Sequence, residues 1–202
     1  MLTLKLKWLQ FTRCRNWLKK SNECPKEDPF SAFIFAWISF NHYYSTFAAE
    51  NKQLFDGWRR QHRRSKGDKT EILFLVHSQE FSEFFDGYRK QYPQRFELSI
   101  ELPVIDMLYG TPVPNGTRVH RKLSDLANED IFRVIYQIRN NLFHGSKDPM
   151  KDQRDYSLCV MAGEFMIPLV ATLLTNTYGE VNNGFDKYKQ GLRDYIRKLA
   201  EA

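Results

Sequence analysis

The chain has 202 residues, of which 42% are hydrophobic and 15% aromatic, a composition typical of a folded domain with a substantial core. Thirty basic and 24 acidic side chains give a formal net charge of +6. The longest strictly apolar run, Ala32–Ile38, is far shorter than the ~20 residues of a membrane-spanning helix, so we expect no transmembrane function. Three cysteines without paired spacing indicate neither a zinc site nor a disulfide framework. No secretory signal is visible, which predicts a cytoplasmic protein.

Positive charge is concentrated in two segments. The first twenty residues carry six basic side chains and no acid, so the other 24 basic and 24 acidic side chains balance each other. A second dense group surrounds Trp58 and His62 and consists of Arg59, Arg60, Arg63, Arg64 and Lys66. Such clusters are typical of proteins that bind a polyanion, either a phosphate backbone or acidic lipid. Solvated helix faces balanced by acids elsewhere in the fold would give the same pattern, and both alternatives stay open.

Two long helices are predicted in the first half of the chain. Residues 30–62 follow an Asp28-Pro29 start signal and carry apolar side chains at helical spacing, namely Phe33, Trp37, Phe40 and Tyr44. A polar break with a glycine follows at 65–69. A second amphipathic helix is expected over 70–92 and should end before Pro93.

Apolar and polar residues alternate in two segments, Leu2–Trp8 and Phe96–Leu102, and this period is typical of strands. Because a lone strand leaves its backbone groups unpaired, we expect the two segments to pair with each other. The side chains expected to face one another are Lys5, Lys7, Glu97 and Glu101. The alternative is an N-terminal amphipathic helix over residues 1–20, which would suit a protein that lies on a membrane surface.

Helical periodicity returns after a turn-rich, irregular segment at 109–116. Asn128 is the expected N-cap of a helix that ends at Gly145, with an apolar stripe of Ile131, Ile135, Ile138 and Leu142. Further helices are expected over 153–176, kinked at Pro168, and over 185–200. We therefore predict a mainly α fold, an up-and-down bundle of four to five helices with a small two-stranded β annexe. Residues 1–202 would form one domain, with a basic annexe (1–29), a helical core (30–177) and a C-terminal helix (183–202).

The most informative segment runs from Val134 to Gly145 and places polar side chains at a helix end. Tyr136, Asn140 and His144 lie in one i, i+4 row, and Arg139 flanks this row. A symmetric partner helix would complete a pocket with second copies of these residues. His144 is expected in the last turn, where the helix dipole stabilises the imidazolium form.

A titratable imidazole beside a guanidinium suits cleavage of RNA without a metal. A base removes the proton of the ribose 2′-hydroxyl, an acid protonates the leaving 5′-oxygen, and arginine stabilises the charged phosphorane. DNA lacks the internal nucleophile. The same residue types near a helix C-terminus can also merely satisfy the last carbonyl groups, so spacing alone leaves both alternatives open.

The sequence Arg139-Asn-Asn-Leu-Phe-His144-Gly resembles the RxxxxH signature of HEPN domains (higher eukaryote and prokaryote nucleotide-binding). The upstream sequence Ala36-Trp-Ile-Ser-Phe-Asn-His-Tyr-Tyr44 resembles the W-x-x-F-N first long helix of this superfamily, particularly its bacterial ApeA-like and MAE-type branches. The resemblance covers residues 30–175. It implies an all-α core, a homodimer whose motif helices face each other, and the activity of a metal-independent endoribonuclease without a cofactor, acting as a toxin or phage-defence effector.

The resemblance also implies roles for individual residues. Arg139 and His144 match the catalytic pair, Asn140 matches the polar companion of the arginine, and Asn41 matches the asparagine of the first helix. HEPN toxins controlled by nucleotidyltransferase antitoxins often carry a tyrosine two residues after the histidine, where this chain has Ser146. Control by tyrosine modification is therefore not expected, although an antitoxin or activator protein remains an expected partner.

RNA is the expected substrate. The residues predicted to bind it are Asn41, Trp58, Arg59, Arg60, Arg63, Arg64 and Lys66, with Trp58 as a stacking platform for a base. The acidic residues Asp125, Glu129 and Asp130 are predicted to cap helices, and no metal site is expected because zinc and nucleotide-hydrolase motifs are absent from the sequence. The alternative function is a non-catalytic HEPN-like module that binds RNA or a protein.

Overall fold

The computed structural model describes residues 4–62, 67–107, 109–143 and 152–184. This part of the chain forms seven α-helices and two two-stranded antiparallel sheets, which confirms the mainly α class with a small β annexe. The helices are α1 (Leu4–Asn22), α2 (Pro29–Glu50), α3 (Lys52–Gln61), α4 (Asp68–Val76), α5 (Gln79–Gln91), α6 (Asn128–Phe143) and α7 (Gln153–Gly184). The strands are β1 (Ser99–Leu102), β2 (Val104–Asp106), β3 (Thr111–Val113) and β4 (Val119–Lys122).

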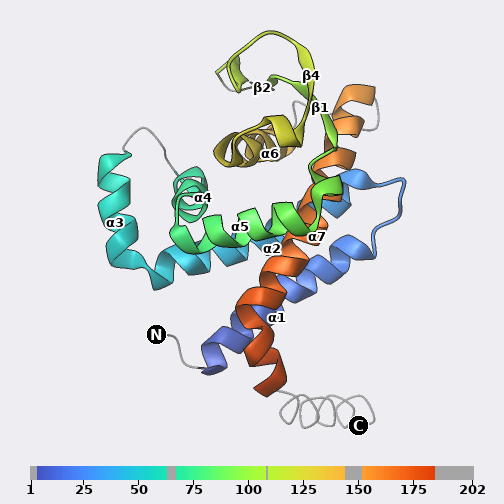
Figure 1. The fold of residues 1–202 in the computed structure, drawn as a ribbon. Helices are drawn as coiled ribbons and strands as arrows, with labels where there is room; N and C mark the ends of the chain where they lie inside the picture. Colours follow the sequence, from blue (N-terminus) through green and yellow to red (C-terminus); the bar gives the residue numbers. More distant parts are fainter. Residues whose placement is uncertain (1–3, 63–66, 108, 144–151, 185–202) are drawn as a thin grey trace.

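Helix α2 is at the centre of the fold and packs against α1, α4 and α7 (Figure 1). It begins where predicted, because the Asp28 carboxylate accepts a hydrogen bond from the backbone N–H of Ser31 at 2.9 Å and Pro29 occupies the first turn. The predicted apolar stripe from Phe33 to Tyr44 is buried, and the Trp37 ring makes edge contacts with its aromatic neighbours on this stripe. These aromatic contacts form the main core between the helices.

The predicted pairing of the N-terminal segment with 96–102 is wrong, because Leu4–Asn22 is a helix. The alternation over 2–8 is short, whereas the apolar side chains of Trp8, Phe11 and Leu18 recur at helical spacing and pack against the core. Helix α1 lies against α2 and α7, and Cys14 is fully buried there. The apolar side of α1, which a helix lying on a membrane would insert, is thus used within the fold.

Both long helices predicted in the first half are divided in two by polar caps. The helix expected over 30–62 ends at Glu50, where the Asn51 side chain and backbone N–H both donate to the Phe47 carbonyl at 3.0 Å. The helix expected over 70–92 is interrupted at Ser78, whose hydroxyl accepts from the N–H of Phe81 at 3.2 Å and so caps α5. The prediction of uninterrupted helices was wrong because it rested on glycine and proline as the only breakers.

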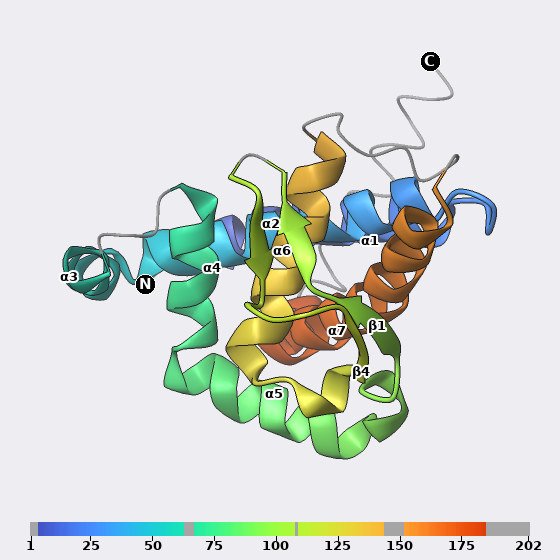
Figure 2. The same ribbon diagram turned by 90° about the horizontal axis from the view of Figure 1, so that it is seen from above.

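The β annexe covers one side of α6 (Figure 2). Strand β1 pairs with β4, and the register places Glu101 opposite His120. The segment 109–116, expected to be irregular, contains β3, which pairs with β2. The predicted strand over 96–102 is therefore confirmed only for its second half, and its partner is a strand close in sequence rather than the N-terminus.

Helices α6 and α7 confirm two further predictions. The apolar stripe of α6 is buried, although Asn128 is the first residue of the helix and not its cap; its side chain accepts a hydrogen bond from Arg89 at 3.0 Å. Helix α7 contains Pro168. By length and composition, its stretch Gln153–Tyr178 would pass as a membrane span, and 61% of the apolar 18-residue window within that stretch is buried inside the fold, as in a core helix. The predicted stop at Gly145 and the helix over 185–200 lie outside the described residues.

Candidate functional site

Arg139 and Asn140 lie together in the last turns of α6. The Nη1 atom of Arg139 donates to the Asn140 side-chain oxygen at 2.8 Å, and the guanidinium lies 4.6 Å from the centre of the Phe143 ring. The Arg139 side chain is 25% exposed. Its Nε is buried and has no hydrogen-bond partner among the described residues. The guanidinium is thus held in place with part of its donor capacity unused.

An acidic residue from another helix completes this arrangement. Asp68, the first residue of α4, has one carboxylate oxygen 3.5 Å from Nη1 of Arg139, and the other accepts a hydrogen bond from the Tyr136 hydroxyl at 2.8 Å. Burial raises the pKa of Tyr136 to about 12, so this hydroxyl keeps its proton and donates it to Asp68. No sequence motif includes Asp68, and its place at a helix start marks it only as an acid favoured by the helix dipole.

Asn41 belongs to the same polar region. Its side-chain amide donates to the hydroxyl of Tyr44, a buried residue whose ring lies 6.3 Å from that of Trp37. The centre of the Trp37 ring in turn lies 6.0 Å from the centre of the Tyr136 ring. Burial raises the pKa of Tyr44, and the charges of Asp68 and Arg139 act on its hydroxyl as well. The structure therefore brings the asparagine of the first motif and the arginine of the second to one aromatic cluster around Trp37.

Asn141, the neighbour of Asn140, points into the protein and has a different role. Its side-chain amide donates to the Ile105 carbonyl at 2.7 Å, and its oxygen accepts from the N–H of Met107 at 3.3 Å. The same oxygen accepts from the side chain of Gln137 at 2.9 Å. The buried amide thus continues the hydrogen bonding of β2 and joins the annexe to the motif helix. The motif's two asparagines lie on different sides of α6, and only Asn140 contacts Arg139.

The basic cluster is described only in part. Arg59 and Arg60 are exposed at the end of α3, whereas the other members of this cluster, Arg63, Arg64 and Lys66, lie outside the described residues. The motif residue His144 also lies outside the described residues. Trp58 is half-buried, and His62 stacks on its ring at 3.9 Å between centroids. One face of the predicted stacking platform is therefore covered by His62 in this conformation. Helix α4 lies between the two regions, since Phe74 contacts Trp58 and Asp68 contacts Arg139.

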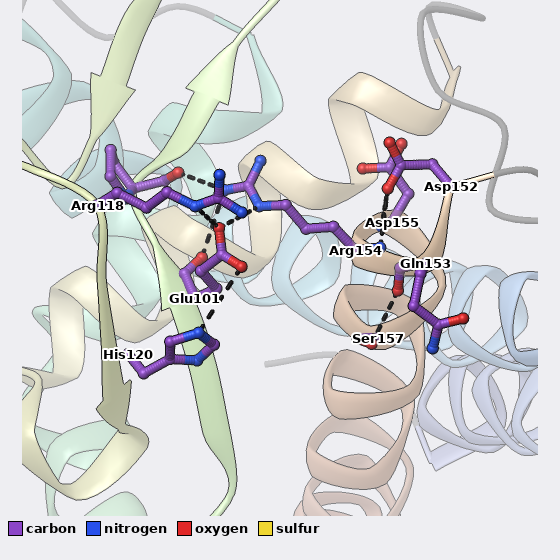
Figure 3. A network of polar contacts seen from close by, with 9 residues as sticks. Glu101, Arg118, His120, Asp152, Gln153, Arg154, Asp155 and Ser157 are labelled. Carbon is purple, nitrogen blue, oxygen red and sulfur yellow. Dashed lines mark hydrogen bonds and ion pairs between the residues drawn. The ribbon is translucent and has the colours of Figure 1, made fainter.

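A second polar network forms around Glu101 in the annexe (Figure 3). Arg118 and His120 approach Glu101 from the β4 side, and Arg154 reaches it from the start of α7. Arg154 also donates to the Pro103 carbonyl at 2.7 Å. The hydrogen bond from Arg118 lowers the pKa of Glu101, and the charge of Arg154 adds to this effect. Glu97 and Glu101, expected to face N-terminal lysines, instead pair with basic residues of the annexe and of α7.

The other candidate side chains have structural partners. His77 lies 3.0 Å from a carboxylate oxygen of Glu129, and Asp125 accepts a hydrogen bond from the backbone N–H of Lys122 at 3.1 Å, as its predicted capping role requires. Across residues 4–62, 67–107, 109–143 and 152–184, no cluster of three or more His, Cys, Asp or Glu side chains is arranged to hold a metal ion. Comparison with protein-family models, with curated proteins and with solved structures finds no match for this chain.

Proposed function

We propose that this protein is a cytoplasmic, metal-independent endoribonuclease of the HEPN type, which cleaves RNA by attack of the ribose 2′-hydroxyl in a dimeric site built from arginine and histidine. Its biological role would be that of a toxin or phage-defence effector, controlled by an antitoxin or an activator protein. The observation that carries this proposal is the Arg139 guanidinium. Asn140 and Asp68 orient it at the end of the motif helix, it is partly exposed, and its Nε is without a partner in the described part of the chain.

The reaction assigned to these residues conserves atoms and electrons. One His144 takes the proton of the 2′-hydroxyl while the 2′-oxygen attacks phosphorus, and Arg139 stabilises the charge on the phosphorane. The P–O5′ bond then breaks, and the second His144 of the dimer gives a proton to the 5′-oxygen. The products are a 2′,3′-cyclic phosphate and a 5′-hydroxyl. Asn140 keeps the guanidinium oriented, and the first-motif Asn41 supports the aromatic cluster beside it.

The arrangement of charges around Arg139 favours this role over that of a cap. A guanidinium that only satisfied the last carbonyls of α6 would bond to those carbonyls, whereas the contacts described for Arg139 are with Asn140, Asp68 and the ring of Phe143. Asp68 neutralises the guanidinium in the free protein, so a phosphate that enters the site exchanges one anion for another. The displaced Asp68 carboxylate, which is 29% exposed, keeps the hydrogen bond from the Tyr136 hydroxyl.

The test is cleavage of RNA by the purified protein in EDTA. His144→Ala and Arg139→Ala are each expected to lower the cleavage rate by roughly 10²–10⁴-fold. Matched controls are His120→Ala and Arg133→Ala, which remove the same side chains from the annexe and from an exposed position of α6, where Arg133 pairs with Glu129. The controls should cleave as fast as the wild type. Metal-free cleavage that persists in both motif variants would refute the assignment.

The second candidate function is a HEPN-like module that binds RNA or a protein without cleaving. The ion pair with Asp68 favours it, because an arginine satisfied within its own chain can have a purely structural role. The same experiment separates the two functions. RNA that is bound by the wild type and by His144→Ala with equal affinity, and is cleaved by neither, would identify the binding module.

A further inference from the structure

A cavity of about 340 Å³ lies between the β annexe and the start of α6, away from Arg139. Its floor is apolar and buried, and consists of Leu102, Pro103 and Leu126. Its rim is exposed and includes Asn115, Thr117 and Arg121. A volume of this size lies at the lower end of the range of small-molecule binding sites, which combine apolar contact with a few polar groups.

The alternation of β4 explains why Arg121 faces this cavity. His120 and Lys122 lie on the other face of the strand, next to Arg118, which directly precedes it; there Arg118 pairs with Glu101 and Lys122 pairs with Glu97. Arg121 lies on the face that lines the cavity and is exposed. In the described part of the chain, Arg121 has no ion-pair partner within 4.0 Å. Arg121, the cation of β4 for which the described residues supply no ion pair, is thus the one that lines the cavity.

Two carboxylates line the same cavity. Asp125 uses one oxygen to accept from the backbone N–H of Lys122, which leaves the other oxygen available. Asp130 is half-buried in the first turn of α6, and no ion pair within 4.0 Å is described for it. Arg121 is thus not neutralised by the two acids beside it. A ligand that presents hydrogen-bond acceptors to the arginine and donors to a carboxylate would satisfy both charges.

Among the four bases of RNA, only guanine presents two adjacent acceptors beside two adjacent donors, so that one ring system can pair bidentately with an arginine and with a carboxylate. Its O6 and N7 accept from arginine, as in the commonest specific contact of proteins with base pairs, and its N1–H and 2-amino group donate to a carboxylate. The proline and leucine side chains of the cavity offer flat apolar contact to the ring. We propose that the annexe cavity binds a guanine base of the RNA substrate, with Arg121 and Asp130 as the residues that select it. This assignment rests on the proposed function, since it names the sequence that the ribonuclease would prefer.

The cavity is separate from the proposed site of cleavage. Asp130 and Arg139 are nine residues apart on α6, about 14 Å along the axis and about half a turn around it. The recognised guanine would therefore lie several nucleotides from the cleaved bond, and the RNA strand would cross α6 between the two sites.

The experiment titrates the full-length protein with guanosine, adenosine, cytidine and uridine, and follows binding by ligand-observed NMR. Nucleosides are used because they lack the phosphate that the basic clusters would bind. Guanosine is expected to bind more tightly than the other three. Asp130→Asn and Arg121→Gln should each weaken it by roughly 5- to 150-fold, the range that loss of one specific base contact corresponds to. Arg118→Gln, the same change at the residue before β4 that pairs with Glu101, should leave guanosine binding unchanged.

The outcomes distinguish this proposal from the proposed function. Guanosine that does not bind, binds no better than adenosine, or binds equally to both cavity variants would overturn the guanine site, whatever the RNA cleavage assay gives. Guanosine binding that is sensitive to the cavity variants, in a protein that cleaves no RNA, would support the guanine site and contradict the nuclease. Unfolding midpoints of Asp130→Asn and Arg121→Gln close to that of the wild type exclude misfolding as the cause of lost binding.

Discussion

Replacing Asn141 by alanine is expected to lower the free energy of unfolding by about 2–3 kcal/mol. The side chain is buried and makes three hydrogen bonds, to Ile105, Met107 and Gln137. At about 0.5–1.5 kcal/mol each, these bonds sum to roughly 1.5–4.5 kcal/mol. The lower half of this range applies because one oxygen serves two donors and because Met107 is exposed, so water replaces part of the loss.

Asn140 provides the matched control one residue earlier. Its side-chain oxygen accepts a hydrogen bond from Arg139 on the half-buried side of α6, so Asn140→Ala should cost no more than about 1 kcal/mol of stability. The RNA cleavage rate is expected to respond in the opposite order: Asn140→Ala should slow cleavage because it frees the guanidinium, while folded Asn141→Ala should retain cleavage.

Urea unfolding measures both variants, and the lower stability of Asn141→Ala should also appear as a decrease of about 4–12 °C in the melting temperature. Hydrogen exchange gives a local measurement, since the Met107 amide should lose protection in Asn141→Ala and keep it in Asn140→Ala. Equal loss of stability in the two variants would refute the conclusion that Asn141, and not Asn140, joins α6 to the annexe.

Two pH-dependent effects follow from the charges. Burial, with a smaller effect of Arg13, lowers the pKa of His42 below its ordinary value of 6.5, so the folded state favours the neutral ring. The contribution of neutral His42 to stability is therefore present above pH 6.5 and is lost as the pH falls below this value. In urea unfolding, His42→Gln should lose less stability than the wild type between pH 7 and pH 5. The hydrogen bond from Arg118, and then the charge of Arg154, lower the pKa of Glu101 below 4.5. The stability that ionised Glu101 contributes to the fold is present above pH 4.5 and is lost in acid. Arg118→Gln should raise the pKa of Glu101 in an NMR titration, and an unchanged pKa would contradict the assigned cause.

Apolar periodicity alone is enough to predict the type of most elements, because it shows which side of a helix is buried. The stripe from Phe33 to Tyr44 on α2 and the isoleucines of α6 are buried as their spacing predicts. The motif that begins at Arg139 is predicted at a helix end from Gly145, and of its residues the structure describes Arg139 to Phe143, which lie in the last turns of α6. Helix ends were less predictable: Asn51 and Ser78 are common polar residues, and their capping role depends on backbone conformations that neighbouring helices impose.

Which segments pack together, and which side chains pair, depends on the tertiary structure. The N-terminal segment could form a strand or a helix, and packing of Trp8, Phe11 and Leu18 against α2 and α7 selected the helix. Asp68 is 71 residues from Arg139, and Arg154 is 53 residues from Glu101, so no local pattern indicates either contact. The neighbouring Asn140 and Asn141 are chemically identical, and only the position of the annexe assigns one to the guanidinium and the other to β2. Periodicity is a property of a short segment and can be recognised in a single sequence. Charge pairs, caps and cavities depend on contacts between distant segments, which form only when the chain has folded.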